Sequence, residues 1–441
     1  MTANYAFDTQ KVNAGYDPAD HNYAVSPPIY QTTAYDFKDV EYAKKLFSFE
    51  EAGNLYTRIG NPTVSVLEQR VAALDGAAAA IAVGSGMAAV SYALLNVAEG
   101  GGRILTSPYL YGGSVDSFKK LYPKFGIHFD YAENIHRPEK LEAEIRPDTK
   151  AIYVESISNP SAALLDIGKI AEVAHRHGIP LIVDNTVATP YLYRPFEHGA
   201  DIVVYSATKG LSGHGNIIAG LVLESGKFNW KSEKFPQFAE AYYTLRDTVT
   251  DEHRTFLQVF PETPFTARIR LVYLNFFGAA LGPFDAYLAL IGLETLSERL
   301  SKQVSNAARV AGWLQARKDD VEWVRYPSLG GSPYRALAER DFPKGAGGIL
   351  AFGFRGSDKQ REAFLDAVRL FHYHVNIGDA RSLIVDSPNN THGELEKHEK
   401  DLADIPLNLI RLSLGLEDPE DLIADLEQAF EAASAGLKIA V

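Results

Sequence analysis

Tyr205-Ser206-Ala207-Thr208-Lys209 ends one apolar run of the chain, and Pro180-Leu181-Ile182-Val183-Asp184 ends an earlier one. A lysine amine can hold an aldehyde cofactor as a Schiff base. A carboxylate such as that of Asp184 can keep a pyridine nitrogen protonated, so that the ring draws electrons from a bound amino acid. The hydroxyls of Ser206 and Thr208 leave room for a phosphate and can donate to it. The pattern therefore indicates pyridoxal phosphate.

Strand and helix patterns alternate around these stretches, from Val64 onward. Several predicted strands are continuous apolar runs, as expected of strands that are covered on both faces. A helix is predicted after Asp166, because apolar residues recur at helical spacing up to the glycine cap at Gly178. The alternation predicts an α/β fold with a mostly parallel central sheet and helices on both faces. The predicted strands are Ala80–Val83, Arg103–Thr106, Ile127–Phe129, Ala151–Glu155, Pro180–Asp184, Asp201–Ser206 and Ala219–Leu223.

Candidate ligand-binding residues stand at the carboxyl ends of these strands, which is where ligands bind in such sheets. Glu155, Asp184 and the turn from Ser206 to Lys209 all have this position. Gly84-Ser85-Gly86-Met87 also follows a predicted strand and opens a predicted helix. Since backbone amides at a helix start bind phosphate, this stretch is predicted either to bind a phosphate or only to allow a tight turn.

The same residues also fit a different site. Gly84 to Ala89 matches a dinucleotide fingerprint, and Tyr205 to Lys209 matches the Tyr-x-x-x-Lys pattern of short-chain dehydrogenases. A dinucleotide site requires an acidic residue about 20 positions after the glycines to bind the ribose. Ile104-Leu105-Thr106-Ser107 stands there and contains none. An NAD-dependent short-chain-type dehydrogenase is therefore kept only as a remote alternative.

Three parts of the chain differ in pattern. Residues 1–65 are rich in Tyr, Asn, Asp and Pro and have little helical or strand period, so they are predicted to form an arm that contacts a neighbouring subunit. Residues 66–290 are the predicted cofactor-binding α/β domain. Residues 291–441 are predicted to form a smaller α+β domain. Its expected elements are helices over 288–314, 360–370 and 419–432 and a strand over 347–354.

Composition excludes several classes of function. The chain has 441 residues, a net charge of -13 and no cysteine. The negative charge argues against a nucleic-acid partner and weakly against anionic membranes, and the missing cysteines exclude disulfides and thiolate catalysis. Histidines lack a matching carboxylate pattern, so no metal site is predicted. No secretory signal or run long enough to span a bilayer is visible, so the expected location is the cytoplasm.

Other candidates for the site are aromatic or cationic. Tyr111 lies on a glycine-containing loop after a strand and can stack on a flat ring. Tyr56 and Arg58 lie on the predicted arm, where Arg58 is either solvated or a bidentate phosphate ligand. Arg411 stands inside a strand-like apolar run, and a buried arginine needs an anion. That anion is either a substrate carboxylate or a structural Asp or Glu.

Taken together, these residues resemble the Cys/Met-metabolism family of pyridoxal-phosphate enzymes, the cystathionine γ-synthase-like group of fold type I. The resemblance covers nearly the whole chain and is greatest to its O-acetylhomoserine sulfhydrylases. The matching stretches are Tyr56-Thr57-Arg58, Val183-Asp184-Asn185-Thr186, Ser206-Ala207-Thr208-Lys209, Gly213-His214-Gly215, Gly378-Asp379-Ala380-Arg381-Ser382-Leu383 and Arg411-Leu412-Ser413-Leu414-Gly415.

The resemblance implies a role for each matching residue. Lys209 would be the Schiff-base lysine and proton shuttle, Asp184 would pair with the pyridine nitrogen, and Tyr111 would stack on the ring and assist proton transfer. The implied phosphate ligands are Gly86, Met87, Ser206 and Thr208, joined by Tyr56 and Arg58 from a neighbouring subunit. The implied ligands of the substrate carboxylate are Arg411, Ser382 and Asn159. The active unit would be a dimer, paired into a homotetramer.

The implied reaction is a γ-replacement that converts O-acetylhomoserine and sulfide into homocysteine and acetate, in methionine biosynthesis. A cystathionine γ-synthase or γ-lyase of the same family is the alternative. Gly113 stands where methionine γ-lyases carry a cysteine, which weakens the lyase interpretation. Residues 210–212, 238–266 and 386–390 also depart from the family pattern and are expected near the substrate entrance. They leave open the acyl group and the sulfur nucleophile.

Overall fold

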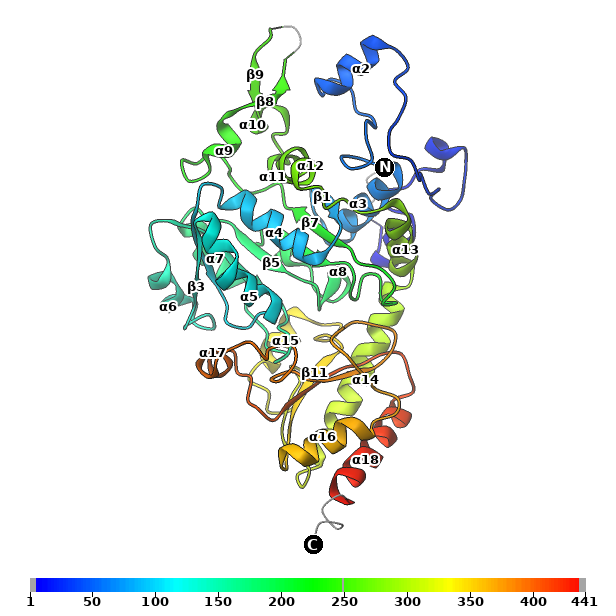
Figure 1. The fold of residues 1–441 in the computed structure, drawn as a ribbon, viewed down its shortest axis with the longest axis vertical. Coiled ribbons are helices and arrows are strands. Elements are labelled where there is room, and N and C mark those ends of the chain that lie inside the picture. Colours follow the sequence, from blue (N-terminus) through cyan, green and yellow to red (C-terminus); the bar gives the residue numbers. More distant parts are fainter. Residues whose placement is uncertain (1–4, 248–249, 436–441) are drawn as a thin grey trace.

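Seven strands form one large sheet, in the order β1-β7-β6-β5-β4-β2-β3, in a computed structural model that describes residues 5–247 and 250–435 (Figure 1). The strands are β1 (Ala79–Val83), β2 (Gly102–Thr106), β3 (Ile127–Tyr131), β4 (Thr149–Glu155), β5 (Leu181–Asp184), β6 (Ile202–Ser206) and β7 (Gly220–Glu224). All seven predicted strands are therefore confirmed, with end residues shifted by a few positions.

The sheet is mostly parallel, as predicted, but one strand reverses. β3, β2, β4, β5 and β6 run parallel to one another, whereas β7 is antiparallel to both β6 and β1. A parallel strand needs a crossover connection of a dozen or more residues that passes over a face of the sheet. The segment between Ser206 and Gly220 instead folds as a turn at the sheet edge, so the chain returns antiparallel and leaves Lys209 at that edge.

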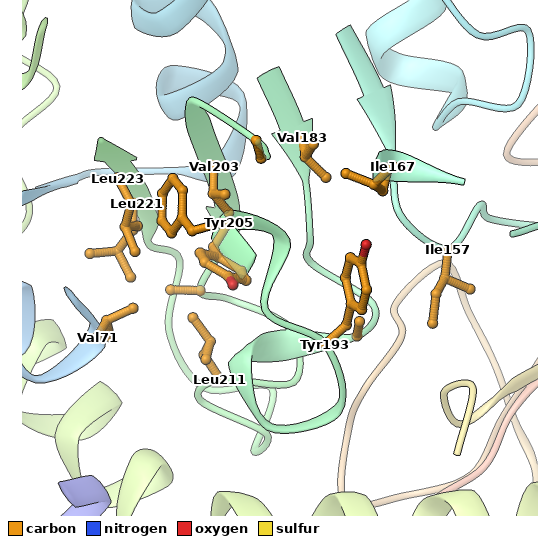
Figure 2. Close-up of a cluster of buried hydrophobic side chains, with 14 of the residues drawn as sticks. Val71, Ile157, Ile167, Val183, Tyr193, Val203, Tyr205, Leu211, Leu221 and Leu223 are labelled. Carbon is orange, nitrogen blue, oxygen red and sulfur yellow. The ribbon is translucent and has the colours of Figure 1, made fainter. Parts of the chain in front are cut away.

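Helices cover both faces of the large sheet because neighbouring strand residues point to opposite sides. Val183 and Val203 pack with helices α3 (Pro62–Asp75), α7 (Ile167–Arg176) and α13 (Pro283–Glu294). Figure 2 shows this cluster, with Val71 of α3 and Ile167 of α7 directed at the strands. On the other face lie α4 (Gly86–Val97), α5 (Gly112–Lys120), α11 (Pro264–Arg268) and the π-helix Ile269–Leu274.

A second, smaller sheet follows in the order β10-β11-β14-β13-β12. Its strands are β10 (Val321–Arg325), β11 (Ile349–Phe354), β12 (His372–Tyr373), β13 (Leu383–Asp386) and β14 (Leu409–Ser413). Helices α14 (Leu296–Ala316), α16 (Asp358–Ala367) and α18 (Pro419–Ala435) pack on it through one apolar cluster. The smaller sheet lies below the large one in Figure 1. The α/β fold with an additional α+β part is thereby confirmed.

The predicted boundaries fall inside helices. The predicted arm holds α1 (Phe7–Asn13), the 3-10 helix Pro18–His21 and α2 (Val40–Phe47), and its end at 65 lies in the first turn of α3. Its residues 1–4 lie outside the described residues. The border at 290 lies within α13, so the domain division stays a prediction.

The remaining elements are short. They are α6 (Pro138–Leu141), α8 (Thr189–Leu192), α9 (Pro236–Ala239), the hairpin of β8 (Ala241–Arg246) and β9 (His253–Thr255), α10 (Phe256–Val259), α12 (Asn275–Phe277), α15 (Arg335–Asp341), α17 (Lys397–Leu402) and the 3-10 turns Tyr122–Phe125, Glu142–Glu144 and Pro195–His198. The β8–β9 hairpin projects from the large sheet near α2 (Figure 1). Within residues 5–247 and 250–435, no helix combines the length and apolarity needed to cross a membrane.

Candidate active site

A cavity of about 240 Å³ opens at the carboxyl edge of the large sheet. Among its lining residues are eight of the predicted site residues, which come from segments spread over more than a hundred positions. They are Gly86, Met87, Tyr111, Asn159, Asp184, Ser206, Thr208 and Lys209. Four other predicted residues, Tyr56, Arg58, Arg411 and Ser382, do not line it. Across the described ranges, no group of three or more acidic or histidine side chains could hold a metal ion.

Lys209 lies in the turn after β6, with its amine in the cavity. Its Nζ donates to Oδ1 of Asn376 at 2.6 Å. Burial, with a smaller effect from the positive charge of Arg411, lowers the pKa of the Lys209 amine to about 8. An amine with such a pKa is partly neutral near neutral pH, and the neutral form is the one that attacks an aldehyde or removes a proton.

Two buried acids face the cavity from neighbouring strands. Asp184 ends β5 beside Glu155, which ends β4 in register with it. Oδ1 of Asp184 accepts from the amide of Thr186 at 2.9 Å, and the Tyr153 hydroxyl lies 3.4 Å from Oδ2. Burial raises the pKa of Asp184, and burial together with the charge of Asp184 raises the pKa of Glu155 well above its usual range. A cation placed beside Asp184 would hold it ionised.

The start of α4 also lines the cavity. Ser85 caps the helix by accepting from the amide of Ala88 at 3.0 Å, and the other first-turn amides have no partner within the helix. A side chain at Gly86 would place its Cβ 2.5 Å from Cβ of Ser206, so the helix can approach β6 only with glycine here. These amides can bind a phosphate.

The two predicted hydroxyl ligands differ in their contacts. Thr208 Oγ1 already accepts from the amide of Ala219 at 2.9 Å and donates to its carbonyl at 3.3 Å. The backbone of Ser206 is fixed by its amide, which donates to Thr186 Oγ1 at 2.8 Å. Thr208 would therefore have to give up its long 3.3 Å bond in order to donate to a phosphate.

Tyr111 stands directly before α5 and is 44% exposed, with its ring at the cavity. Its amide donates to Oε1 of Glu155 at 2.6 Å, which fixes the backbone of the loop. A side chain at Gly113 would place its Cβ 2.6 Å from Cε1 of the Tyr111 ring. Gly113 therefore gives Tyr111 the room that it occupies here.

Arg411 lies on β14 of the smaller sheet and is fully buried. Its Nη1 donates to Oδ1 of Asn159 at 3.1 Å and its Nη2 to the carbonyl of Asn376 at 2.8 Å, whereas its Nε has no partner. Burial lowers the pKa of the guanidinium to about 10. In the part of the chain that the structure describes, no carboxylate forms an ion pair with Arg411. It therefore remains available for an anionic ligand.

The other predicted residues have different surroundings. The Ser382 hydroxyl donates to Oε2 of Glu417 at 2.8 Å and accepts from the amide of Gly415 at 2.8 Å. Arg58 lies over the Tyr56 ring at 5.1 Å, away from the cavity of its own chain. The proposed contact of Tyr56 and Arg58 with a neighbouring subunit thus stays a prediction.

Tyr205 bears on the dehydrogenase alternative. Its hydroxyl donates to Oδ2 of Asp75 at 2.8 Å and accepts from Asn185 at 2.8 Å. Tyr205 lies in the apolar cluster beneath the sheet, among Val203, Leu211 and Leu221 (Figure 2). The Tyr-x-x-x-Lys pattern therefore does not place tyrosine and lysine in one cavity, and this geometry opposes the dehydrogenase interpretation.

Sequence reasoning missed Asn376, the partner of Lys209. The two residues are 167 positions apart, and nothing near Asn376 signals the contact. Thr186 was also missed, although its position two residues after Asp184 pointed to it. The divergent segments do not line the cavity of this chain, and their expected place near the substrate entrance stays a prediction. Asp386 instead forms a buried ion pair with Arg361 at 3.2 Å.

The site fits pyridoxal phosphate. Free helix-start amides, a glycine that a side chain could not replace, a buried lysine and a buried carboxyl surround one cavity. Lys209 would hold the aldehyde, Asp184 the ring nitrogen, and Gly86, Met87 and Ser206 the phosphate.

Comparison with known proteins gives the family. The model of the Cys/Met metabolism PLP-dependent enzyme family matches residues 8–431. Homocysteine synthase of Schizosaccharomyces pombe is 40% identical over 97% of this chain and 98% of its own, and O-acetyl-L-homoserine sulfhydrylase 1 of Thermus thermophilus is 39% identical over 96% and 99%. The crystal structure of a candidate O-acetylhomoserine (thiol)-lyase of Campylobacter jejuni, which contains N'-pyridoxyl-lysine-5'-monophosphate, matches with a TM-score of 0.92 and 37% identity over 97% and 100% of the two chains. The chain belongs to the Cys/Met metabolism family of PLP-dependent enzymes.

Proposed function

We propose that this protein is an O-acetylhomoserine sulfhydrylase, which replaces the acetate of O-acetylhomoserine by sulfide and yields homocysteine for methionine biosynthesis. The names of its full-length relatives support the substrate. The observation that carries the proposal is that Lys209 and Asp184 line one cavity, while Arg411 lies behind its wall, bonded to the lining residue Asn159. Arg411 has one buried nitrogen without a hydrogen-bond partner. Together these three residues can hold an α-amino acid by its carboxylate with its Cα near a lysine amine.

Pyridoxal phosphate, when bound, withdraws electrons from the Cα of an amino acid and so makes its proton removable. Asp184 would keep the ring nitrogen protonated, which requires its ionised form. Gly86, Met87, Ser206 and Thr208 would hold the phosphate through two amides and two hydroxyls. Tyr111 would cover one side of the ring and exclude water from it.

Arg411 would bind the α-carboxylate of the substrate. Its partners Asn159 and Asn376 both present oxygen atoms to it, so they orient the guanidinium without neutralising it. An anion that reaches its Nε would satisfy a buried donor and pair a buried charge at the same time. Such binding would place the amino group and Cα of the substrate on the side of the cavity where Lys209 lies.

Lys209 would move the protons. With a pKa of about 8, its amine can take the proton from Cα and return it later. A second proton leaves Cβ, and the Cγ–O bond then breaks and releases acetate. Sulfide forms the new Cγ–S bond, and the protons return to Cβ and Cα. The sum is O-acetylhomoserine plus sulfide to homocysteine plus acetate.

The same proposal includes a homotetramer of two active dimers in the cytoplasm. Tyr56 and Arg58, which lie away from the cavity of their own chain, would reach the phosphate in the partner's cavity. Size-exclusion chromatography with light scattering tests the assembly, and mixing an Arg58→Ala chain with a Lys209→Ala chain tests the shared site. Recovery of activity in the mixed dimer is the expected result.

The reaction is tested with purified holoenzyme and O-acetylhomoserine, given first sulfide and then cysteine, with products identified by mass spectrometry. Homocysteine from sulfide is expected, with slower or no formation of cystathionine. Preferential formation of cystathionine would instead favour a cystathionine γ-synthase. O-succinylhomoserine in place of O-acetylhomoserine tests the acyl group in the same assay.

A further inference from the structure

The turn after β13 reaches across to the loop that carries Tyr111. Within the turn, the carbonyl of Ser387 accepts from the amide of His392 at 2.9 Å, so the backbone bonds to itself. His392 is 1% exposed, and its Nε2 lies 3.3 Å from the carbonyl oxygen of Leu110. A side chain at Gly112 would collide with the carbonyl of Thr391. The turn and the loop therefore touch directly on both sides of Tyr111.

The hydrogen bonds fix the tautomer of His392. The Leu110 carbonyl can only accept, so Nε2 must carry the proton. Nδ1 then accepts, and the hydroxyl of Thr391, at 2.9 Å from Nδ1, is its donor. Burial lowers the pKa of His392 to about 4, so the ring stays neutral throughout the neutral pH range. Protonation of His392 therefore does not alter the contact between turn and loop over this pH range.

Further contacts continue along α5, whose first turn follows Tyr111. Nζ of Lys120 lies 2.7 Å from Oε2 of Glu394, and Lys119 pairs with Glu399. The exposed Lys120–Glu394 pair contributes little to stability, but both pairs show that α5 and the segment 394–399 lie side by side. From the other side, Glu155 accepts from the amide of Tyr111.

We propose that His392 is a positioning residue for Tyr111: by donating to the Leu110 carbonyl it holds the Tyr111 loop from the side of the smaller sheet, as Glu155 holds it from the large sheet. The proposal rests on the proposed function of Tyr111 at the cofactor. His392 lies in the same turn as residues 386–390, which depart from the family pattern and do not line the cavity. This turn acts on the site through the loop behind Tyr111.

Two replacements of His392 separate donation from packing. His392→Phe fills the volume but cannot donate, and His392→Gln can still donate through its amide nitrogen. Because misplacement of a reacting group by about 1 Å can cost up to about 100-fold, we expect His392→Phe to lower kcat about tenfold. We expect it to leave KM for O-acetylhomoserine within about twofold of wild type, and His392→Gln to restore most of kcat. The matched control is His198→Phe. The ring centroids of His198 and Tyr193 are 4.6 Å apart, and a phenylalanine ring can keep this stacking, so the variant should behave as wild type.

Two further measurements require no substrate. In His392→Phe holoenzyme, amide hydrogen exchange of residues 110–113 should be faster than in wild type, since the loop opens more often. The visible circular dichroism of the bound cofactor should change, because Tyr111 no longer holds one orientation against it. If wild type fails to convert O-acetylhomoserine with sulfide, the proposed function fails, and these two readouts still decide the role of His392.

The proposal is overturned if His392→Phe keeps wild-type kcat and exchange, or if His392→Gln is as impaired as His392→Phe. Should His392→Phe fail to fold, Thr391→Val takes its place. Loss of the Thr391 hydroxyl releases Nδ1, and a loss of kcat of about threefold with faster exchange of residues 110–113 is expected. A Thr391→Val enzyme indistinguishable from wild type would then reject the proposal.

Discussion

At the carboxyl edge of the large sheet, polar side chains are buried both toward the apolar core and toward the cavity. The two groups differ in their hydrogen-bond partners. On the core side, Ser156 donates to Asn185 at 2.6 Å, Asn185 to Tyr205 at 2.8 Å and Tyr205 to Asp75 at 2.8 Å. On the cavity side, Lys209 has one side-chain partner. The core-side groups form a chain of hydrogen bonds that supports the fold, whereas the Lys209 amine, with one side-chain partner, keeps capacity for a ligand.

The strongest test of this contrast is Lys209→Ala. The variant should lose about 10³-fold or more of kcat/KM, since both the covalent hold on the cofactor and the proton transfer disappear. Borohydride reduction of wild type should attach the cofactor to the peptide that contains Lys209, and this label should be absent in the variant. A variant that kept both the label and its activity would refute the assignment. Lys227→Ala, on the surface, is the control.

Two buried arginines allow the next test. Arg299 donates to the carbonyls of Gly210, Leu211 and Gly292, and burial lowers its pKa to about 10, as it does for Arg411. Of these two arginines, only Arg411 has a nitrogen without a hydrogen-bond partner. Arg411→Met should raise KM for O-acetylhomoserine about 100-fold, near the upper end of the value of one charge-assisted hydrogen bond.

Arg299→Met should instead lower the melting temperature by several degrees, because it leaves three carbonyls without their donor, and should change KM by about twofold or less. Steady-state kinetics and thermal unfolding of both variants provide the comparison. Equal effects of the two substitutions on KM would remove the distinction between structural and ligand-binding arginines.

Asn376→Leu should have a smaller effect. The amide oxygen of Asn376 stabilises the charged form of Lys209, so its loss should lower the pKa of the amine further below about 8. The rate at which an acylating reagent labels Lys209 in the apoprotein, followed by mass spectrometry against pH, measures this shift. Asn216→Leu, in the exposed turn between β6 and β7, is the control. A shift toward higher pKa would contradict the assigned contact.

The smallest effect concerns Asp75, on the core side. Burial raises its pKa to about 7, from a usual value near 3.8. The folded state therefore holds a proton that the unfolded state has already lost, and stability falls as pH rises through the folded pKa. Between pH 6 and pH 8 this group should cost about 1.4 kcal/mol of unfolding free energy. Urea unfolding at both pH values should show that Asp75→Asn loses less unfolding free energy between pH 6 and pH 8 than wild type does.

Local sequence predicted most of the cofactor side of the site. Strands covered on both faces are apolar runs that end at a polar residue, so Asp184, Glu155 and Lys209 could be placed at one edge. Long-range pairing could not be predicted in this way. Asn376 precedes β13 without any pattern of its own, and no strand was predicted where the β8–β9 hairpin forms. The hydroxyl of Ser382 bonds to Glu417 because two distant loops meet there.

The bond between Lys209 and Asn376 also has a consequence for the order in which the site is made. Synthesis proceeds from the N-terminus, and domains fold as units as they emerge. The last strand of the large sheet ends at Glu224, so the strand edge that bears Lys209 can form while residues 376 and 411 are still untranslated. The cofactor ligands that the chain itself would provide are thus synthesised before Arg411, the proposed substrate ligand, whereas the cavity around them is complete only once Val375 and Ile377 have followed.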